Sequence, residues 1–268
     1  MSSFGTPIIV GVAQLTQRWG EGDCQKHPLA LMADAASAAL ADTGVGDREM
    51  AKAIDRVMVV NTITWSYRDA PAVLAELLGI RNAALTYTTI GGNTPQYLAN
   101  QAAAALQSGS CRAVLLAGAD CGYSARQLHK HGVELGWPAM KEPAYMNGDG
   151  RTAISSPEFA YELALPAYVY PLFETALRAA SGRGPREHSA YLGNLYQRLA
   201  AVAASNPLAW SAEDRSAHDI SHPGTDNRYI GYPYTKLMNA NMNVDQGAAL
   251  LLPTDVEAAR AGIDEDLW

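Results

Sequence analysis

The sequence predicts an α/β fold: a five-stranded, mostly parallel sheet with helices on both faces and a long inserted cap. Up to Asp120, short apolar runs alternate with alanine- and leucine-rich runs, an order typical of parallel strands joined by helices. The short runs are apolar on both sides, as in strands buried between two helical layers. An apolar run returns late in the chain, at residues 244–252, and we expect it to complete the sheet.

The first three elements follow from local sequence. Residues 7–14 (PIIVGVAQ) form a continuous apolar run with β-branched residues and predict a strand. Residues 29–41 lack a helix breaker and predict a helix, with Pro28 favourable at its first turn. Glycines at 44 and 46 end that helix, and residues 54–62 (IDRVMVVNT) predict the second strand.

The next four elements repeat the alternation. Residues 70–78 predict a helix with Asp69 as its N-cap. Residues 83–89 predict the third strand and residues 95–107 the third helix. Residues 113–119 (AVLLAGA) then predict the fourth strand.

The chain is predicted to divide into three segments. Residues 1–121 form an α/β core, residues 122–240 an inserted loop and cap region, and residues 241–268 the return strand and last helix of the core. The insertion holds all but one of the histidines and has many proline and glycine breaks, with helical stretches predicted at 163–180 and 188–204.

The last helix has a recognisable start. Thr254 is its predicted N-cap, and Glu257 three residues later completes a capping box.

Composition disfavours several classes of function. The 268 residues carry a net charge of −7 and no basic stripe, which disfavours nucleic-acid binding. The N-terminus lacks the features of a signal peptide, and no apolar run is long enough to span a membrane. The cysteines at 24, 111 and 121 form no disulfide framework, so we expect a cytoplasmic protein.

The stretch 88–96 (TTIGGNTPQ) connects the third strand to the third helix. Such a strand-to-helix elbow often mounts a nucleophile, and the helix N-terminus offers free N–H groups to an anion. Here the elbow holds glycine, asparagine and threonine, and no cysteine.

Several motifs coincide in order and spacing. They are the opening strand PIIVGVAQLTQR, the elbow, the helix tail and strand LQSGSCRAVLLAGAD, SNPL at 205–208, YPYTKL at 232–237 and NVDQGAAL at 243–250. Together they resemble the N-terminal half of the thiolase superfamily, specifically the sterol-carrier-protein-2-type thiolases and their acetyl-CoA acetyltransferase-like relatives. The resemblance implies a thiolase N-terminal fold and a relation to acyl transfer between coenzyme A thioesters.

The elbow departs from the family pattern. Alignment places Gly92 at the family's nucleophilic cysteine, and a one-residue shift would place Gly91 there. Neither glycine can attack a thioester, because the covalent route needs a thiolate. The resemblance therefore implies no catalytic residue in the elbow. It leaves Gly92, Asn93 and Thr94 as candidates for binding an oxyanion or another anion.

The resemblance also bears on completeness and partners. Thiolases repeat the α/β topology, and their second half carries the catalytic histidine and a second cysteine; this chain is expected to end where that half would begin. We therefore expect either a homo-oligomer, formed through the third strand as in thiolases, or a complex with a chain that supplies the second half. No cofactor is expected to be required, and a coenzyme A thioester is the expected substrate or ligand.

The functional expectation is a thiolase-like protein of acyl-CoA and lipid metabolism that is inactive as a thiolase on its own. Whether it is an enzyme stays open. The alternative is a non-catalytic subunit that binds lipid or acyl-CoA or scaffolds a partner chain. A nucleotide-dependent enzyme is disfavoured, because neither GxGxxG nor GxxxxGK occurs.

The remaining candidate residues have competing interpretations. Asn93 is interpreted first as a helix cap, and Thr94 as a nucleophile would need a base that the sequence does not show. His129 with His131, and His218 with His222, are expected to be solvated loop residues, since no third metal ligand follows. Residues 140–146 and four aromatic side chains are expected either to pack the cap or to line an acyl pocket: Tyr161, Tyr168, Tyr170 and Phe173.

Overall fold

The computed structural model describes residues 5–20, 25–132, 136–152 and 154–268. The chain forms two compact units, residues 1–150 with 243–268 (the core unit) and residues 151–242 (the insertion unit). The sequence places the start of the insertion earlier, at residue 122. Residues 122–150 group with the core because the amides of Lys141 and Ala144 donate to the carbonyls of Ser66 and Arg68, at 3.1 and 2.8 Å.

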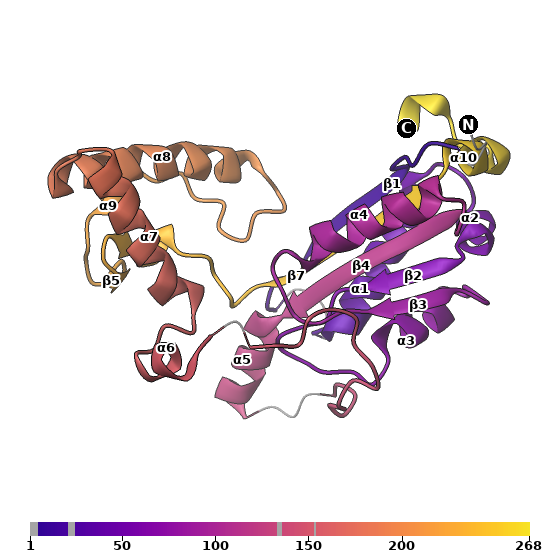
Figure 1. Ribbon diagram of the computed structural model, residues 1–268, viewed down its shortest axis with the longest axis horizontal. Coiled ribbons are helices and arrows are strands. Elements are labelled where there is room, and N and C mark those ends of the chain that lie inside the picture. The colour runs from indigo at the N-terminus through magenta and orange to yellow at the C-terminus, as the bar shows by residue number, and fades with distance from the viewer. Residues whose placement is uncertain (1–4, 21–24, 133–135, 153) are drawn as a thin grey trace. The chain divides into compact units, whose positions relative to one another are not determined.

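The core unit contains the predicted five-stranded sheet (Figure 1). Its strands are β1 (Gly11–Thr16), β2 (Arg56–Val59), β3 (Ala84–Tyr87), β4 (Ala113–Cys121) and β7 (Asp245–Pro253), in the order β1-β7-β4-β2-β3. β7 runs antiparallel to both β1 and β4, while β2 is parallel to β3 and β4. Four of the five strands therefore point the same way, which confirms the mostly parallel α/β sheet.

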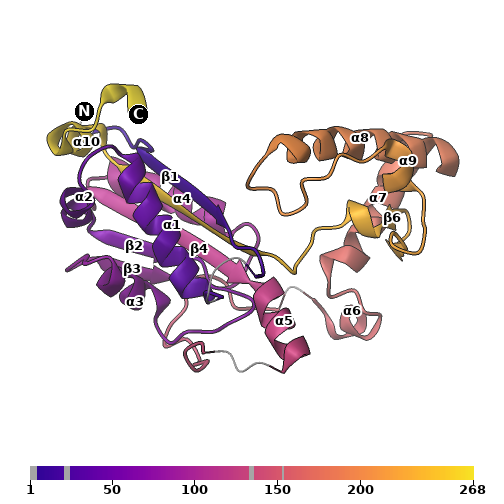
Figure 2. The same ribbon diagram turned by 180° about the vertical axis from the view of Figure 1, so that it is seen from behind.

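Helices cover the sheet on both faces, as predicted. The core helices are α1 (Pro28–Asp42), α2 (Asp47–Ala53), α3 (Ala70–Leu77), α4 (Thr94–Gln107), α5 (Gly122–His131) and α10 (Asp255–Ala261), with a 3₁₀ turn at Glu265–Leu267. α1 and α3 pack on one face, seen in front in Figure 2, and α4 lies on the other, seen in front in Figure 1. Along β2, Val57 and Val59 face α1 and α3 while Met58 faces α4, the alternation expected of a strand buried on both sides.

Helix ends follow the sequence at several positions. The Asp69 side chain accepts from the amide of Ala72 and caps α3, and Thr254 accepts from the amide of Glu257 and caps α10. Both predicted N-caps are confirmed.

One glycine fixes how closely α1 approaches the sheet. A Cβ atom on Gly11 would lie 2.1 Å from the carbonyl oxygen of Ala39 in α1. Backbone cannot yield as a flexible side chain can, so a larger residue at this position must push α1 and β1 apart.

Gly11→Ala is therefore expected to lower the free energy of unfolding by roughly 1–3 kcal/mol, the usual range for overpacking. Urea denaturation followed by circular dichroism measures it. Gly224→Ala is the matched control, because a Cβ there meets nothing within 4 Å. Equal stability of the two variants would contradict the close packing of α1 on β1.

The insertion unit is mainly helical. Its elements are α6 (Ser156–Ala160), α7 (Pro166–Ala180), α8 (Pro185–Ser205), α9 (Ala217–Ser221), a hairpin of β5 (Tyr229–Gly231) and β6 (Tyr234–Thr235), and a 3₁₀ turn at Lys236–Met238. A small apolar cluster of Leu192, Ile220 and Met238 forms its core. No helix in the described parts of the chain has the length and hydropathy needed to cross a membrane.

Candidate functional site at the β3–α4 elbow

The elbow links the end of β3 to the start of α4, as the sequence predicts. The amide of Thr94 donates to the carbonyl of Gly91 at 3.1 Å, and the amide of Tyr97 donates to the carbonyl of Asn93 at 3.1 Å. Pro95 in the first turn has no N–H to donate. The backbone bonds thus hold a tight turn directly before the helix.

Asn93 occupies the N-cap position of α4, but its side chain makes no capping hydrogen bond. The expectation that Asn93 caps the helix with its side chain is therefore wrong. The reason is its backbone conformation (φ −89°, ψ −9°), which is helical, whereas capping residues are usually extended. The Asn93 side chain therefore does not occupy the amides at this helix start, and an external acceptor could bind them without displacing it.

The two elbow glycines differ in the space around them. A Cβ on Gly92 would meet nothing within 4 Å, whereas a Cβ on Gly91 would lie 2.7 Å from the Thr94 hydroxyl oxygen and 3.1 Å from Asn93 Oδ1. Gly92 is exposed, and Thr94 is buried. The open position is therefore Gly92, next to a buried Thr94.

A distant segment borders the elbow. The amide of Thr89 donates to the carbonyl of Asn147 at 3.0 Å, and the amide of Asn147 donates to the carbonyl of Tyr87 at 2.6 Å. The preceding Met146 receives a hydrogen bond on its sulfur from the Asn61 amide at 3.5 Å. Part of the predicted 140–146 segment therefore lies at the end of β2 and β3. No local pattern predicts this pairing, which joins residues about sixty positions apart.

The aromatic candidates of the insertion are exposed to solvent within their own unit. Tyr161 follows α6, and Tyr168, Tyr170 and Phe173 lie on α7, all with side chains at least 40 % exposed. Tyr170 and Phe173 contact each other with ring centroids 6.4 Å apart.

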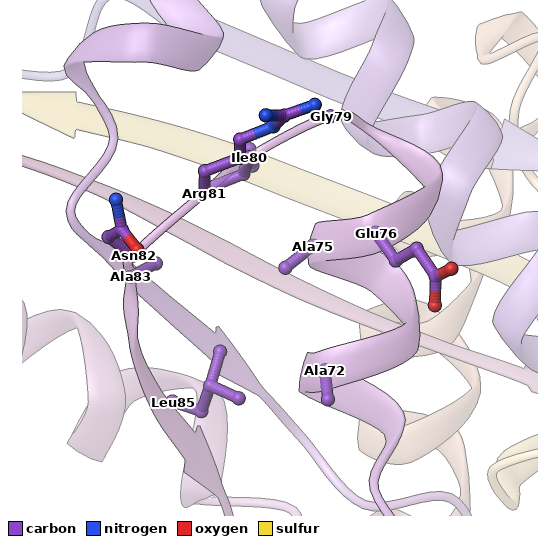
Figure 3. Close-up of a pocket in the computed structure, with 9 residues that line it drawn as sticks. All are labelled: Ala72, Ala75, Glu76, Gly79, Ile80, Arg81, Asn82, Ala83 and Leu85. Carbon is purple, nitrogen blue, oxygen red and sulfur yellow. The ribbon is translucent and has the colours of Figure 1, made fainter.

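A hollow of about 390 Å³ lies beside β3, but at the end of the strand away from the elbow. Figure 3 shows it between the last turn of α3 and the start of β3, with Arg81 and Glu76 among the charged residues around it. It therefore does not provide the elbow with a binding pocket.

The described cysteines are poor nucleophiles. Cys121, at the end of β4, is fully buried; burial raises the pKa of its thiol, and the nearby carboxylates of Asp245 and Asp120 raise it further. Burial also raises the pKa of Cys111. Little thiolate forms at neutral pH in either case. Cys24 is outside the described residues.

The histidine pairs lie on helices, which corrects the loop expectation. His129 and His131 are in the last turn of α5. His218 is in α9 and His222 ends it, and their rings stack 3.7 Å apart because they are four residues apart on one helical face. In the described ranges, no three His, Cys, Asp or Glu side chains are grouped to hold a metal ion.

Sequence reasoning missed the role of Asp245. This carboxylate is fully buried and accepts from the amides of Tyr123 and Ser124, at 2.9 and 3.0 Å. It also accepts from the Ser124 hydroxyl, and from the Gln17 side chain at 3.3 Å. It caps the start of α5 from another strand. The only signal in the sequence was an acid directly before an apolar strand.

Among known proteins, this chain is similar to solved structures. No protein-family model matches the chain, and no curated protein matches its sequence. Among solved structures, it is similar to a monomeric SCP2-thiolase-like protein type 1 from Mycobacterium smegmatis, at 28% identity and a TM-score of 0.76, covering 100% of this chain and 50% of that one.

Two further structures share the fold. An Ltp2–ChsH2(DUF35) aldolase is 20% identical with a TM-score of 0.63, over 95% of this chain and 57% of that one. Human mitochondrial 3-ketoacyl-CoA thiolase in complex with CoA is 14% identical with a TM-score of 0.56, over 98% of this chain and 68% of that one. The chain thus spans only about half the length of the SCP2-thiolase-like protein.

Proposed function

Because this chain belongs to the thiolase superfamily and is SCP2-thiolase-like, we propose that it acts in acyl-CoA and lipid metabolism and binds a coenzyme A thioester at the β3–α4 elbow. The observation that carries the proposal is the open helix start. Asn93 leaves the first turn of α4 without a side-chain cap, and the space beside Gly92 is empty.

The elbow suits the oxygen of a thioester. Backbone amides at a helix N-terminus point outward and lie at the positive end of the helix dipole, so they stabilise a carbonyl oxygen that gains negative charge. Gly92 and Asn93 are the proposed donors. Thr94 contributes through the turn its backbone forms with Gly91, because its side chain is buried.

We propose further that this chain does not perform thiolase chemistry alone. A covalent acyl intermediate needs a thiolate within about 3–3.5 Å of the thioester carbon. Gly92 has no nucleophile, and burial raises the pKa of the thiols of Cys111 and Cys121. Acyl transfer would therefore need a cysteine or histidine brought to the elbow by another polypeptide, in a homo-oligomer or from a chain resembling the second thiolase half.

The second candidate is a non-catalytic subunit that binds acyl-CoA or lipid. The exposed aromatic side chains of α7 favour it, since a protein that holds an apolar tail needs apolar surface. The unpaired thiols of Cys111 and Cys121 suit a reducing cytoplasm, which we propose as the location for either function.

The experiment titrates the purified chain with acetyl-CoA and with longer acyl-CoA esters while its thermal midpoint is recorded. Binding to the native state alone is expected to add about 2.7 kcal/mol of stability at a ligand concentration 100 times Kd. A Gly92→Glu variant, which fills the open space and adds a negative charge, is expected to bind more weakly.

Thiolysis of acetoacetyl-CoA by the unmodified chain tests the inactive elbow, which both candidates assume. We expect no turnover above background. Sustained turnover would contradict the inactive elbow, and an unchanged midpoint with every acyl-CoA would contradict binding.

A further inference from the structure

A strap of irregular backbone, residues 137–147, leads to the elbow within the core unit. The amides of Lys141 and Ala144 in this strap donate to backbone carbonyls of residues 66–68, and its last residue, Asn147, bonds to the end of β3 directly before the elbow. Most strap residues are exposed. A segment with few buried contacts opens more easily than the sheet does, so its attachment depends on a small number of anchors.

The main anchor of the strap is Trp137, which is partly buried. Its indole N–H donates to the carbonyl of Gln25 at 2.9 Å, and the indole N–H of Trp65 donates to the carbonyl of Pro138 at 2.8 Å. The rings of Trp65 and Trp137 meet edge to face, with centroids 5.1 Å apart. Such aromatic pairs stabilise a contact beyond the area that they bury. The start of the strap is therefore held by two indoles.

His27, the residue before α1, lies against this anchor. Its ring centroid is 6.4 Å from that of Trp137 and 6.0 Å from that of Tyr67. Its Nδ1 atom accepts from the amide of Ala30 at 3.3 Å, which caps α1, and lies 3.0 Å from the Tyr67 hydroxyl. The Tyr67 oxygen accepts from the amide of Leu29 at 3.2 Å, so its own proton is free to go to His27. This arrangement fits a neutral imidazole with its proton on Nε2.

A proton on Nδ1 would disrupt the arrangement. Protonated histidine has a donor at each ring nitrogen, so the amide of Ala30 would lose its acceptor and the Tyr67 hydroxyl would have to turn away. The positive end of the α1 dipole also disfavours a cation at this position. A charged His27 is therefore expected to leave its place, and its contact with Trp137 breaks as it does so.

His27 is the group at this contact whose charge changes near neutral pH. Burial lowers its pKa from the ordinary value of 6.5. Burial also raises the pKa of the facing Tyr67 phenol, and Cys121 and Asp120 raise it further, so Tyr67 stays neutral. The preceding Lys26 is exposed and pairs with Asp34.

We propose that protonation of His27 releases the strap from the core unit, so that mild acid loosens the backbone that leads into the elbow. The backbone provides the connection, because the segment that pairs with Lys141 and Ala144 also carries Tyr67. At the other end of the strap, the bond from the Thr89 amide to Asn147 is lost with release. The proposal goes beyond the proposed function, because release requires no thioester.

Hydrogen exchange of single amides, followed by NMR between about pH 5 and 8, tests the proposal. Because the released form binds the proton more tightly, attachment is strongest above pH 6.5 and weakens as the pH falls below it. The protection factors of the Lys141, Ala144 and Thr89 amides are expected to fall by up to about tenfold per pH unit in that range. Amides within β4 should keep their protection.

His27→Asn is the decisive variant, because asparagine is a good N-cap and stays neutral at every pH. It should keep α1 intact and abolish the pH dependence at the strap, and His27→Gln provides a second neutral side chain if the first variant folds poorly. His218→Asn is the matched control, since it removes an exposed histidine of the insertion unit and should leave the pH dependence unchanged.

Constant protection of the strap amides in the parent chain would overturn the proposal. So would an equal fall in a folded variant that lacks His27, because another group would then be responsible. A fall in the parent chain and in His218→Asn that disappears without His27 would support the proposal. None of these outcomes depends on whether the chain binds an acyl-CoA, so the proposed function is tested separately.

Discussion

Replacing Asp245 with alanine is expected to lower the free energy of unfolding by roughly 3–5 kcal/mol, because several buried donors lose one acceptor together. The amides of Tyr123 and Ser124, the Ser124 hydroxyl and the Gln17 side chain all donate to this carboxylate, which is fully buried. Hydrogen bonds to a charged acceptor are individually stronger than neutral ones, and a buried donor left without a partner adds its desolvation penalty.

Urea unfolding of the Asp245→Ala variant measures this effect. Asp34→Ala is the matched control, since its carboxylate is 41% exposed and pairs with Lys26 at the surface, where ion pairs contribute about 1 kcal/mol or less. Asp245→Asn keeps one acceptor oxygen and should fall between the two. Equal losses for Asp245→Ala and Asp34→Ala would show that the buried network contributes nothing beyond a surface pair.

The location of Asp245 explains why so much depends on one side chain. α5 leads the chain towards the insertion unit, and β7 brings it back. The carboxylate joins the start of α5 to the start of β7, and the amide of Gly122 donates to the carbonyl of Val244 at 3.0 Å in the same place. The core unit thereby closes its sheet across an insertion of about ninety residues. A sequence pattern marks neither contact.

Local patterns predicted the strands and helices of the core well, because each buries a continuous apolar face. The first strand shows where such patterns fail. Residues 7–14 were expected, whereas the regular ladder covers Gly11–Thr16. The amide of Val10 donates to the carbonyl of Leu251, although Leu251 is the register partner of Gly11. The pairing before Gly11 is therefore shifted by one residue, and the ladder is irregular there. Composition cannot show this irregularity, because it depends on the partner strand.

The strand order could not be predicted from the sequence, for a related reason. β7 enters between β1 and β4 from more than a hundred residues away and runs antiparallel to both. Short helices such as α2 and α9 were also missed, since one or two turns give too little periodicity. Long-range pairing, and not local propensity, fixes these parts of the fold.

At the elbow, the sequence identified the segment but not its details. Two glycines, an asparagine and a proline between a strand and a helix predicted the turn. Which glycine is open depends on how Thr94 and Asn93 are placed, and whether Asn93 caps depends on its backbone angles. The bond between Thr89 and Asn147 depends on a chain segment about sixty residues further along the sequence. These are properties of the folded chain.

A cysteine introduced at Gly92 is expected to become the most reactive thiol among the described positions. A Cβ there meets nothing within 4 Å, so Gly92→Cys should fold normally. A thiol at a helix N-terminus is more acidic than a free one, because the dipole stabilises the thiolate. Cys121 is the internal comparison, since burial raises the pKa of its thiol. At pH 7 we expect alkylation of Gly92→Cys to be at least ~100-fold faster than that of Cys121.

Timed iodoacetamide labelling followed by peptide mass mapping measures the two rates. Gly150→Cys is the matched control, an exposed glycine with equal space but not at a helix start, and Cys24→Ser is present in both variants. If dipole and amides act at position 92, its thiol should react roughly tenfold faster than that at 150 near neutral pH. Equal rates would show that the elbow does not stabilise negative charge.

Acetyl-CoA then tests whether the elbow activates a thioester as well as a thiol. The thiolate at position 92 would attack the carbonyl carbon, the bond from that carbon to the coenzyme A sulfur would break, and coenzyme A would leave as a thiolate that takes up a proton. Mass spectrometry should detect one acetyl group on Gly92→Cys and none on Gly150→Cys at equal labelling by iodoacetamide. The thiol at position 92 could instead react quickly with iodoacetamide and take up no acetyl group. That outcome would show that the elbow stabilises an anion but that its amides do not hold the carbonyl oxygen of the thioester in a reactive geometry.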